Sequence, residues 1–224
     1  MEQTLSKNAE AEIANYFAGV FAWMFAGLTV SGIVAWFVAH SSVAQQAFFG
    51  NPITLILLIA AQLGVVILLA ARITKMSPMA ARAGFLAYAA LLGITLSYIF
   101  LAYTSTSIMR IFFITASMFF FMAIIGYITK KDLSRLGGIL LMGLIGIIIA
   151  TIVNIFLHSN AVQIIISYLG VAIFLGLTAY DTQKIKGFYE SDKKDQLAIM
   201  GALALYLDFI NLFLFLLRIF GNTR

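Results

Sequence analysis

The chain has 224 residues, of which 62% are hydrophobic and only 10% are charged. Soluble domains carry about 25% charged residues, so this composition cannot cover a water-facing surface and predicts an integral membrane protein. Cysteine is absent, which excludes a disulfide framework and a thiolate metal site. The formal net charge of +5 does not indicate nucleic-acid binding, because the lysines and arginines cluster in short connections between apolar runs.

The chain begins with a polar segment of mixed charge, residues 1–15, which lacks the pattern of a secretory signal peptide. Seven apolar runs follow, each close to the roughly 20 residues that a membrane-spanning helix needs. They are Tyr16–His40, Ile53–Ile73, Met79–Tyr103, Ile108–Ile128, Leu136–Leu157, Val162–Asp181 and Leu197–Phe220. We therefore predict an all-α membrane protein with a cytoplasmic tail over 1–15 and a single seven-helix transmembrane domain over 16–224.

Proline and phenylalanine refine this assignment. Pro52 suits the first turn of the second helix, and Ser77 with Pro78 breaks the chain before the third. The fourth run is rich in phenylalanine, which predicts a helix that faces lipid.

The basic residues are distributed unevenly between the two sides. Eleven of the fourteen fall in the N-terminal tail and in the connections after the second, fourth and sixth runs, and only Arg110, Arg218 and Arg224 fall on the other side. The positive-inside rule then predicts a cytoplasmic N-terminus and, with seven crossings, a C-terminus outside. Arg218 and Arg224 oppose this orientation slightly, and would fit better if the last run did not cross fully.

Asp208 is the most unusual residue of the chain, because it interrupts the last apolar run. Uncharged residues extend from Leu197 to Leu207 before it and from Phe209 to Leu217 after it. At ~1.5 Å per residue the carboxyl lies about 15 Å from either end, near the middle of a hydrocarbon core about 30 Å thick. An acid at that depth costs roughly 2.5–3.5 kcal/mol on insertion scales, so we expect Asp208 to point into a helix bundle.

The helical spacing supports this orientation. One face of the helix carries Gly201, Ala204, Asp208, Asn211, Leu212 and Phe215. The two small residues before the acid allow neighbouring helices to approach closely and enclose it.

Asp181 is the second acid in or beside an apolar run, and the other seven acids lie in tails or loops. Taken alone, it is an ordinary hydrated acid at a helix end. Its helix and that of Asp208 are consecutive and antiparallel, however, so the two carboxyls are candidates for a pair. Asp181 is expected at the cytoplasmic boundary and Asp208 near the middle, so contact needs helix tilt, an indented funnel or a broken helix.

Two segments around these acids, GLTAYDTQKIK and ALALYLDFINLFLFLLRIFG, resemble the characteristic motifs of the Bax inhibitor-1 family, also called transmembrane Bax-inhibitor-motif proteins. The resemblance includes KKDLSRLGGILLMGLIG, covers essentially the whole chain, and is strongest to bacterial inner-membrane members. It implies a seven-helix bundle with the last helix at the centre. It also implies a pH-sensitive Ca²⁺ leak gated by an aspartate pair, which matches Asp181 and Asp208 here.

The resemblance further implies an arginine from the second span that bonds to the aspartate pair in one state. Arg72 is the best candidate for this latch, while Arg82 opens the third span. An ordinary arginine flanking the cytoplasmic end of a span is the alternative interpretation of Arg72.

The chemistry of two carboxyls in contact suits this implied role. Ionising both groups at once is unfavourable because the two negative charges repel each other, so a proton or a cation is expected between them. Ca²⁺ prefers six to eight oxygens, so Asp181 and Asp208 predict a weak Ca²⁺ site that backbone carbonyls and water complete. A weakly bound Ca²⁺ ion can leave the site, which suits conduction through the membrane better than tight Ca²⁺ binding. Asn211, one turn after Asp208, is either a supporting hydrogen-bond partner or a polar contact between helices.

Enzyme motifs are missing from the sequence: there is no Gly-rich phosphate loop, nucleophile motif or HExxH. We expect no catalysis and no cofactor. The expected permeant ion is Ca²⁺, and the expected partners are the lipid bilayer, Ca²⁺ and protons.

Three functions remain open. They are a passive pH-gated cation leak, a proton-coupled secondary transporter, and a non-conducting regulator that binds another membrane protein such as a membrane protease. A purely structural role for the acids in packing is the remaining alternative.

Overall fold

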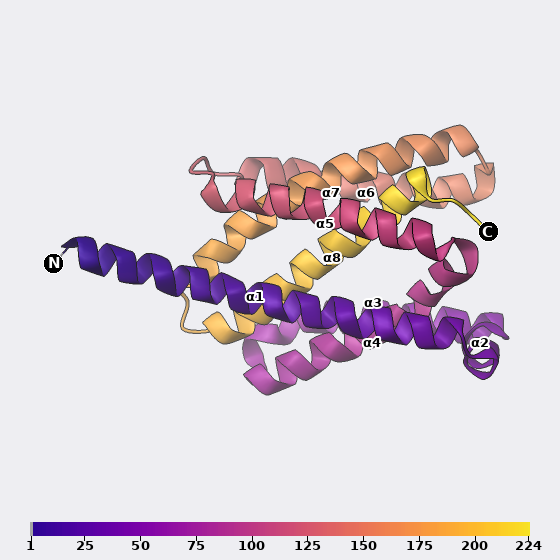
Figure 1. The fold of residues 1–224 in the computed structure, drawn as a ribbon, viewed down its shortest axis with the longest axis horizontal. Coiled ribbons are helices and arrows are strands. Elements are labelled where there is room, and N and C mark those ends of the chain that lie inside the picture. The colour runs from indigo at the N-terminus through magenta and orange to yellow at the C-terminus, as the bar shows by residue number, and fades with distance from the viewer. Residues whose placement is uncertain (1) are drawn as a thin grey trace. The chain divides into compact units, whose positions relative to one another are not determined.

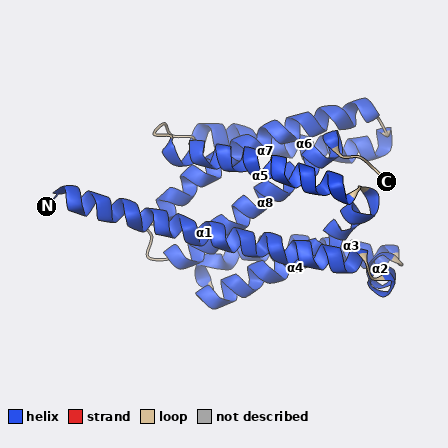
Figure 2. Ribbon diagram, in the orientation of Figure 1, coloured by secondary structure: helices blue, strands red, loops and turns tan. Residues whose placement is uncertain are grey.

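The computed structural model describes residues 2–224, with side chains from residue 11 onward. Helices dominate this part of the chain and short loops join them (Figures 1 and 2). The elements are α1 (Glu2–Ala39), α2 (Ser42–Phe49), α3 (Pro52–Arg72), the 3-10 turn η1 (Ile73–Lys75), α4 (Pro78–Ala102), α5 (Ser105–Ile128), α6 (Ser134–Leu157), α7 (Asn160–Phe188) and α8 (Lys194–Phe220).

Seven of these helices, all except α2, are long and apolar enough to cross a membrane. This confirms the predicted number and order of spans and the all-α membrane class. The short helix α2 was not expected from the sequence. Helix α1 extends through most of the predicted polar tail, since its backbone is helical from Glu2.

The predicted breaks before α3 and α4 have side-chain caps. The Asn51 side chain accepts a hydrogen bond from the Ile53 amide at 2.9 Å, and Pro52 follows as the first residue of α3. The Ser77 hydroxyl accepts a hydrogen bond from the Ala80 amide at 3.2 Å at the start of α4. Both boundaries agree with the sequence patterns.

The end of α7 differs from the prediction. The apolar run ends at Asp181, but the helix continues to Phe188. The added segment mixes two lysines with the buried Ile185, so it continues the helix although it is no longer an apolar run. Asp181 therefore lies about 10 Å inside the helix end, at ~1.5 Å per residue.

The described chain forms two compact units, and each is described separately. The first comprises α1–α4 together with Ile185–Tyr206. Its buried centre contains Tyr206, whose ring packs edge-on against Phe85 at 5.6 Å and Tyr88 at 6.2 Å between centroids. The Ser31 hydroxyl donates to the Ala89 carbonyl at 2.8 Å and lies 2.6 Å from the Tyr206 hydroxyl. Because the Ser31 proton is used, Tyr206 is the donor to Ser31.

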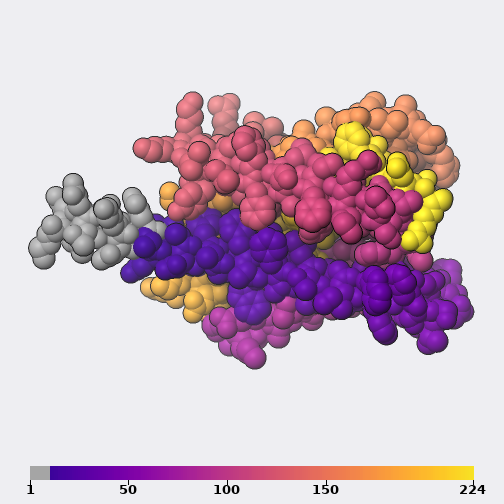
Figure 3. Space-filling model, in the orientation of Figure 1, coloured from indigo at the N-terminus to yellow at the C-terminus, as the bar shows by residue number. Residues whose placement is uncertain are grey.

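Helix α1 provides one long surface of the first unit. In the space-filling view its side chains form a continuous band (Figure 3). Trp36 and Phe37 are among its exposed large apolar residues. Such side chains are compatible with a lipid environment, in which apolar exposure carries no hydrophobic penalty.

The second unit comprises Tyr103–Lys184 and Leu207–Arg224. Aromatic contacts join α5 to α8, since Phe209 packs against Phe112 at 5.4 Å and Phe119 at 5.5 Å between ring centroids. Phe119 is fully buried. The expectation that all of the phenylalanine-rich span faces lipid is therefore wrong, because part of this aromatic surface packs against α8.

Helix α8 is the most buried of the spans. An 18-residue apolar stretch of α8 is 67% buried, whereas the corresponding stretch of every other span is at most 33% buried. This agrees with the expectation that the last helix is central. It also explains how an acid is accommodated in α8, because few of its positions face lipid.

Candidate functional site

Asp208 lies near the middle of the 27-residue helix α8. Its side chain is only 4% exposed, so it points inward as the spacing predicted. Its Oδ2 atom is buried without a hydrogen-bond partner in the described chain. Most buried polar atoms in proteins form at least one hydrogen bond, so a buried carboxyl oxygen without one is unusual.

The structure brings Asp181 of α7 together with Asp208 of α8. The two side chains are within hydrogen-bonding reach of each other. The longer α7 removes part of the mismatch in depth, because Asp181 lies about two turns inside the helix rather than at its end. Two carboxyl groups in this arrangement can share a proton or flank a cation.

Small residues on α5 and α6 allow close approach to the segment of α7 that carries Asp181. A Cβ at Gly126 of α5 would lie 2.2 Å from the Ala179 carbonyl oxygen. A Cβ at Gly137 of α6 would lie 2.5 Å from the Tyr180 ring. These glycines therefore fix α7 immediately before the acid by direct backbone and ring contact.

The polar neighbours of Asp181 on α7 are bonded within their own helix. The Thr178 hydroxyl donates to the Phe174 carbonyl, and the Thr182 hydroxyl donates to the Thr178 carbonyl, both at 2.7 Å. Among the described residues no group of three or more His, Cys, Asp or Glu side chains is placed to hold a metal ion. The pair supplies two carboxyl groups, and a bound divalent ion would need backbone or water oxygens in addition.

Gln183 is a site neighbour that the sequence reasoning missed. Its side-chain amide donates to the carbonyls of Thr129 at 3.1 Å and Lys131 at 2.8 Å, and its oxygen accepts from the Leu133 amide at 2.8 Å. It thereby fastens the α5–α6 connection to α7 two residues after Asp181. Its place inside the motif that carries Asp181 was the available signal.

Lys184 and the predicted latch residue Arg72 have different environments. Lys184 lies near enough to Asp181 to act on its carboxyl electrostatically, and its ammonium lies 5.9 Å from the centre of the Tyr180 ring. Arg72 is exposed at the end of α3 in the first unit. The latch role of Arg72 remains a prediction.

Asn211 differs from both alternatives that the sequence left open. Its side-chain nitrogen donates to the Leu207 carbonyl of its own helix at 2.8 Å, and no other hydrogen bond of this side chain occurs among the residues described. Short polar side chains often bond back to the preceding turn in this way. In this structure Asn211 supports neither Asp208 nor a neighbouring helix.

The fold and the paired acids together define a class: multi-pass, all-α membrane proteins with two carboxyls in contact between helices. A family model described as "Inhibitor of apoptosis-promoting Bax1" matches residues 13–224. The chain belongs to the Bax inhibitor family, as its motifs predicted.

Relatives in several bacteria align over nearly the whole chain. The inner membrane protein YbhL of Escherichia coli K12 is 49% identical, with 96% of this chain and 94% of YbhL covered. An uncharacterized protein of Borreliella burgdorferi is 42% identical, with 93% and 92% covered. An uncharacterized membrane protein of Streptococcus pyogenes serotype M3 is 36% identical, with 99% of each chain covered.

Proposed function

We propose that the protein is a pH-sensitive leak pathway for Ca²⁺ in the bacterial inner membrane, gated by Asp181 and Asp208. The observation that carries the proposal is the contact between these carboxyls, with Asp208 Oδ2 buried and unpartnered in the described chain. Placing an acid in a membrane helix costs roughly 2.5–3.5 kcal/mol, and intramembrane acids commonly serve ion or proton pathways.

Exchange between a proton and a cation gives the pair its gating chemistry. Two ionised carboxylates in contact repel each other strongly in a region of low dielectric constant. A shared proton removes this repulsion and holds α7 and α8 together. A cation that replaces the proton removes it as well, through carboxylate oxygens, the ligands that Ca²⁺ prefers.

The small number of Ca²⁺ ligands that the pair supplies favours passage of the ion over tight binding. Tight Ca²⁺ sites use about six to eight oxygens, whereas this pair offers two carboxyl groups. Carbonyls and water must complete the shell, so binding is weak and release is rapid. Conduction requires this combination of entry and escape.

The orientation and membrane are part of the same proposal. The relative YbhL is named as an inner membrane protein. Eleven of the fourteen basic residues lie on the side that we assign to the cytoplasm, together with the N-terminus.

Calcium flux into proteoliposomes tests the proposal with the full chain and the variants Asp181→Asn and Asp208→Asn. Each variant keeps the shape of the side chain and removes its charge. We expect at least about a tenfold loss of flux in both, the effect of about 1.4 kcal/mol. Folding should be unharmed, since an amide is less costly than an ionised acid in a membrane helix. Asp132→Asn, a change in an exposed loop acid, is the matched control and should leave flux unchanged.

The pH profile of the same flux provides the sharper readout. A doubly protonated pair offers no charge to Ca²⁺, and a doubly ionised pair retains a cation most strongly. We therefore expect a maximum at intermediate pH, where one proton is held and one carboxylate is free. Equal, pH-independent flux in all variants would remove the pair from the mechanism. Flux only with an imposed proton gradient would indicate coupled transport, and no flux at all would indicate a non-conducting regulator.

A further inference from the structure

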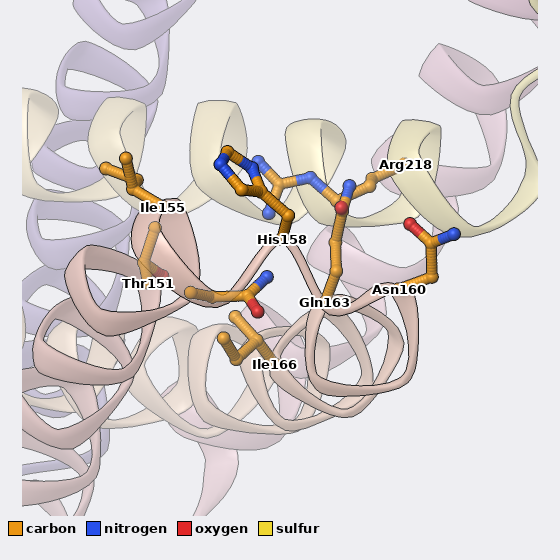
Figure 4. A pocket seen from close by; sticks show the side chains of 8 residues that line it. Thr151, Ile155, His158, Asn160, Gln163, Ile166 and Arg218 are labelled. Carbon is orange, nitrogen blue, oxygen red and sulfur yellow. The ribbon is translucent and has the colours of Figure 1, made fainter.

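A cavity of about 490 Å³, with several polar side chains in its lining, lies where α6, α7 and α8 meet in the second unit. It is at the opposite ends of α7 and α8 from the α7–α8 connection. Its lining includes Asn154, His158, Asn160, Gln163 and Arg218, and Figure 4 shows the labelled side chains gathered around one space. An adjoining cavity of about 400 Å³ shares three of them, including Arg218. Neither Asp181 nor Asp208 lines either cavity, so this site is separate from the carboxyl pair.

The sharp turn between α6 and α7 builds the cavity wall. His158 ends α6 in the left-handed conformation, with φ of 48°, and its amide donates to the Asn154 carbonyl at 2.9 Å. The Asn154 side chain then accepts from the Ser159 amide at 3.1 Å, and α7 starts at the next residue. Asn160 and Gln163 are three residues apart, which places both on one face of α7.

Arg218 brings an uncompensated positive charge to this space. No acidic residue lines the cavity, and within the described chain Arg218 forms neither an ion pair nor a hydrogen bond. Its guanidinium lies 5.6 Å from the centre of the Phe215 ring. The last turn of α8 favours a cation, but that preference satisfies none of the five guanidinium donors.

The side-chain amides beside Arg218 are also available. Those of Asn160 and Gln163 form no hydrogen bond to any described residue. The cavity thus combines a permanent cation with free amide donors and has no competing carboxylate. This set of groups complements an anion with several acceptor oxygens.

Apolar surface continues from the cavity along the outer faces of α6 and α7. Ile155 and Ile164 line the cavities and are 60% and 55% exposed, and Tyr168 beside them is 54% exposed. In a span of this composition such positions face hydrocarbon. A molecule that fits both features therefore has an anionic head and long apolar chains.

We propose that this cavity binds the phosphate of an anionic phospholipid, with Arg218 as its main contact and the acyl chains along α6 and α7. Phosphatidylglycerol fits better than phosphatidylcholine. Both carry a phosphate, but the choline ammonium repels the Arg218 guanidinium at close range. The preference follows from the charge of the cavity and does not depend on ion conduction.

Native mass spectrometry of the purified full-length protein tests this site with phosphatidylglycerol, phosphatidylcholine and inorganic phosphate. We expect wild type to retain phosphatidylglycerol at least about tenfold more strongly than phosphatidylcholine, because only phosphatidylcholine carries an ammonium that the Arg218 guanidinium repels. Arg218→Gln should abolish that preference, and Arg218→Lys should restore most of it. Arg224→Gln is the matched control, since it removes one positive charge outside the cavity and should leave the preference intact.

Further outcomes decide against the proposal. Equal retention of the two lipids by wild type, or an equal loss with Arg224→Gln, would overturn it. Binding of inorganic phosphate that displaces phosphatidylglycerol at equal concentration would assign the site to a free anion and overturn the lipid assignment. If Arg218→Gln does not fold, Gln163→Leu removes an amide donor to the phosphate without a change of charge, and unchanged retention of phosphatidylglycerol in that variant would contradict the site.

Discussion

At the scale of single residues, Gln183 shows how one side chain can fix a connection. The five residues between α5 and α6 carry two exposed lysines, and three hydrogen bonds of the Gln183 side chain hold this segment against α7.

Hydrogen bonds from Ser134 to the Asp132 carboxylate add a local restraint and lower the pKa of Asp132 below its ordinary value of 3.8. That restraint is complete above pH 3.8 and is lost as the pH falls through the lowered pKa.

Replacing Gln183 by Leu should release this connection. The variant keeps the side-chain bulk and removes three hydrogen bonds, each with a net contribution of about 0.5–1.5 kcal/mol. We expect trypsin to cleave after Lys130 and Lys131 at least about tenfold faster than in wild type, because the opened segment is populated more often. Cleavage after Lys193 and Lys194 in the α7–α8 connection is the internal control. Unchanged cleavage at both places would show that Gln183 does not hold the segment.

At the scale of helices, glycine sets the closest approach between neighbouring spans. Membrane helices associate through tight packing rather than through a hydrophobic driving force, so small residues mark their contacts. Gly126 lies against the backbone of α7 near Ala179, whereas a Cβ at Gly146 of α6 would meet no atom of a neighbouring helix within 4 Å. A Cβ at Gly201 of α8 would lie 2.8 Å from the Ile185 side chain of α7, as the small face of α8 predicted.

Alanine substitutions at two of these glycines should have opposite effects. At Gly126 the added methyl meets a carbonyl oxygen at 2.2 Å, and overpacking of this kind typically costs about 1–3 kcal/mol. At Gly146 the methyl has free space, and alanine gains about 0.5–1 kcal/mol in a helix. Thermal unfolding in detergent should therefore give a lower Tm for Gly126→Ala and an equal or higher Tm for Gly146→Ala. Equal shifts in the two variants would contradict the packing argument.

Helix number and type were predictable, because each span is an apolar run of about the 20 residues that a membrane-spanning helix needs, roughly twice the length of a spanning strand. The end of α7 was not, because hydropathy marks where a helix leaves the apolar phase and not where its hydrogen bonding stops. Segment 182–188 carries two lysines and is no longer an apolar run, yet it extends the helix by seven residues. This difference mattered for the site, since it moved Asp181 away from the helix end.

The candidate site was predictable only in part. Asp208 could be assigned to the interior from its isolation in an apolar run, and its burial confirms that assignment. Gln183 and the cavity around Arg218 depend on contacts between residues far apart in the chain, for which one sequence carries no direct signal. Asn211 was misjudged because a side chain that bonds back to its own helix has the same spacing as one that faces a partner.

At the scale of the whole molecule, the length of α8 bears on orientation. Arg218 and Arg224 at the C-terminal end opposed the predicted orientation. Helix α8 has 27 residues and is about 40 Å long, which exceeds a hydrocarbon core of about 30 Å. Arg218 lies in its last turn, so a fully crossing helix places this guanidinium at the interface, where long basic side chains reach water.

Reporter fusions in a bacterial host test this orientation directly. We expect a reporter that is active only outside the cytoplasm to be active after Arg224 and inactive when inserted within 190–195. An insertion within 129–133 is the control and should match the 190–195 result, because both connections carry the lysines that the positive-inside rule retains in the cytoplasm. Replacing those lysines by Gln should weaken the asymmetry and give mixed labelling. Activity on the same side for the fusion after Arg224 and the insertion within 190–195 would mean that α8 does not cross, and Asp208 would then lie at a different depth from the one that gating by the pair requires.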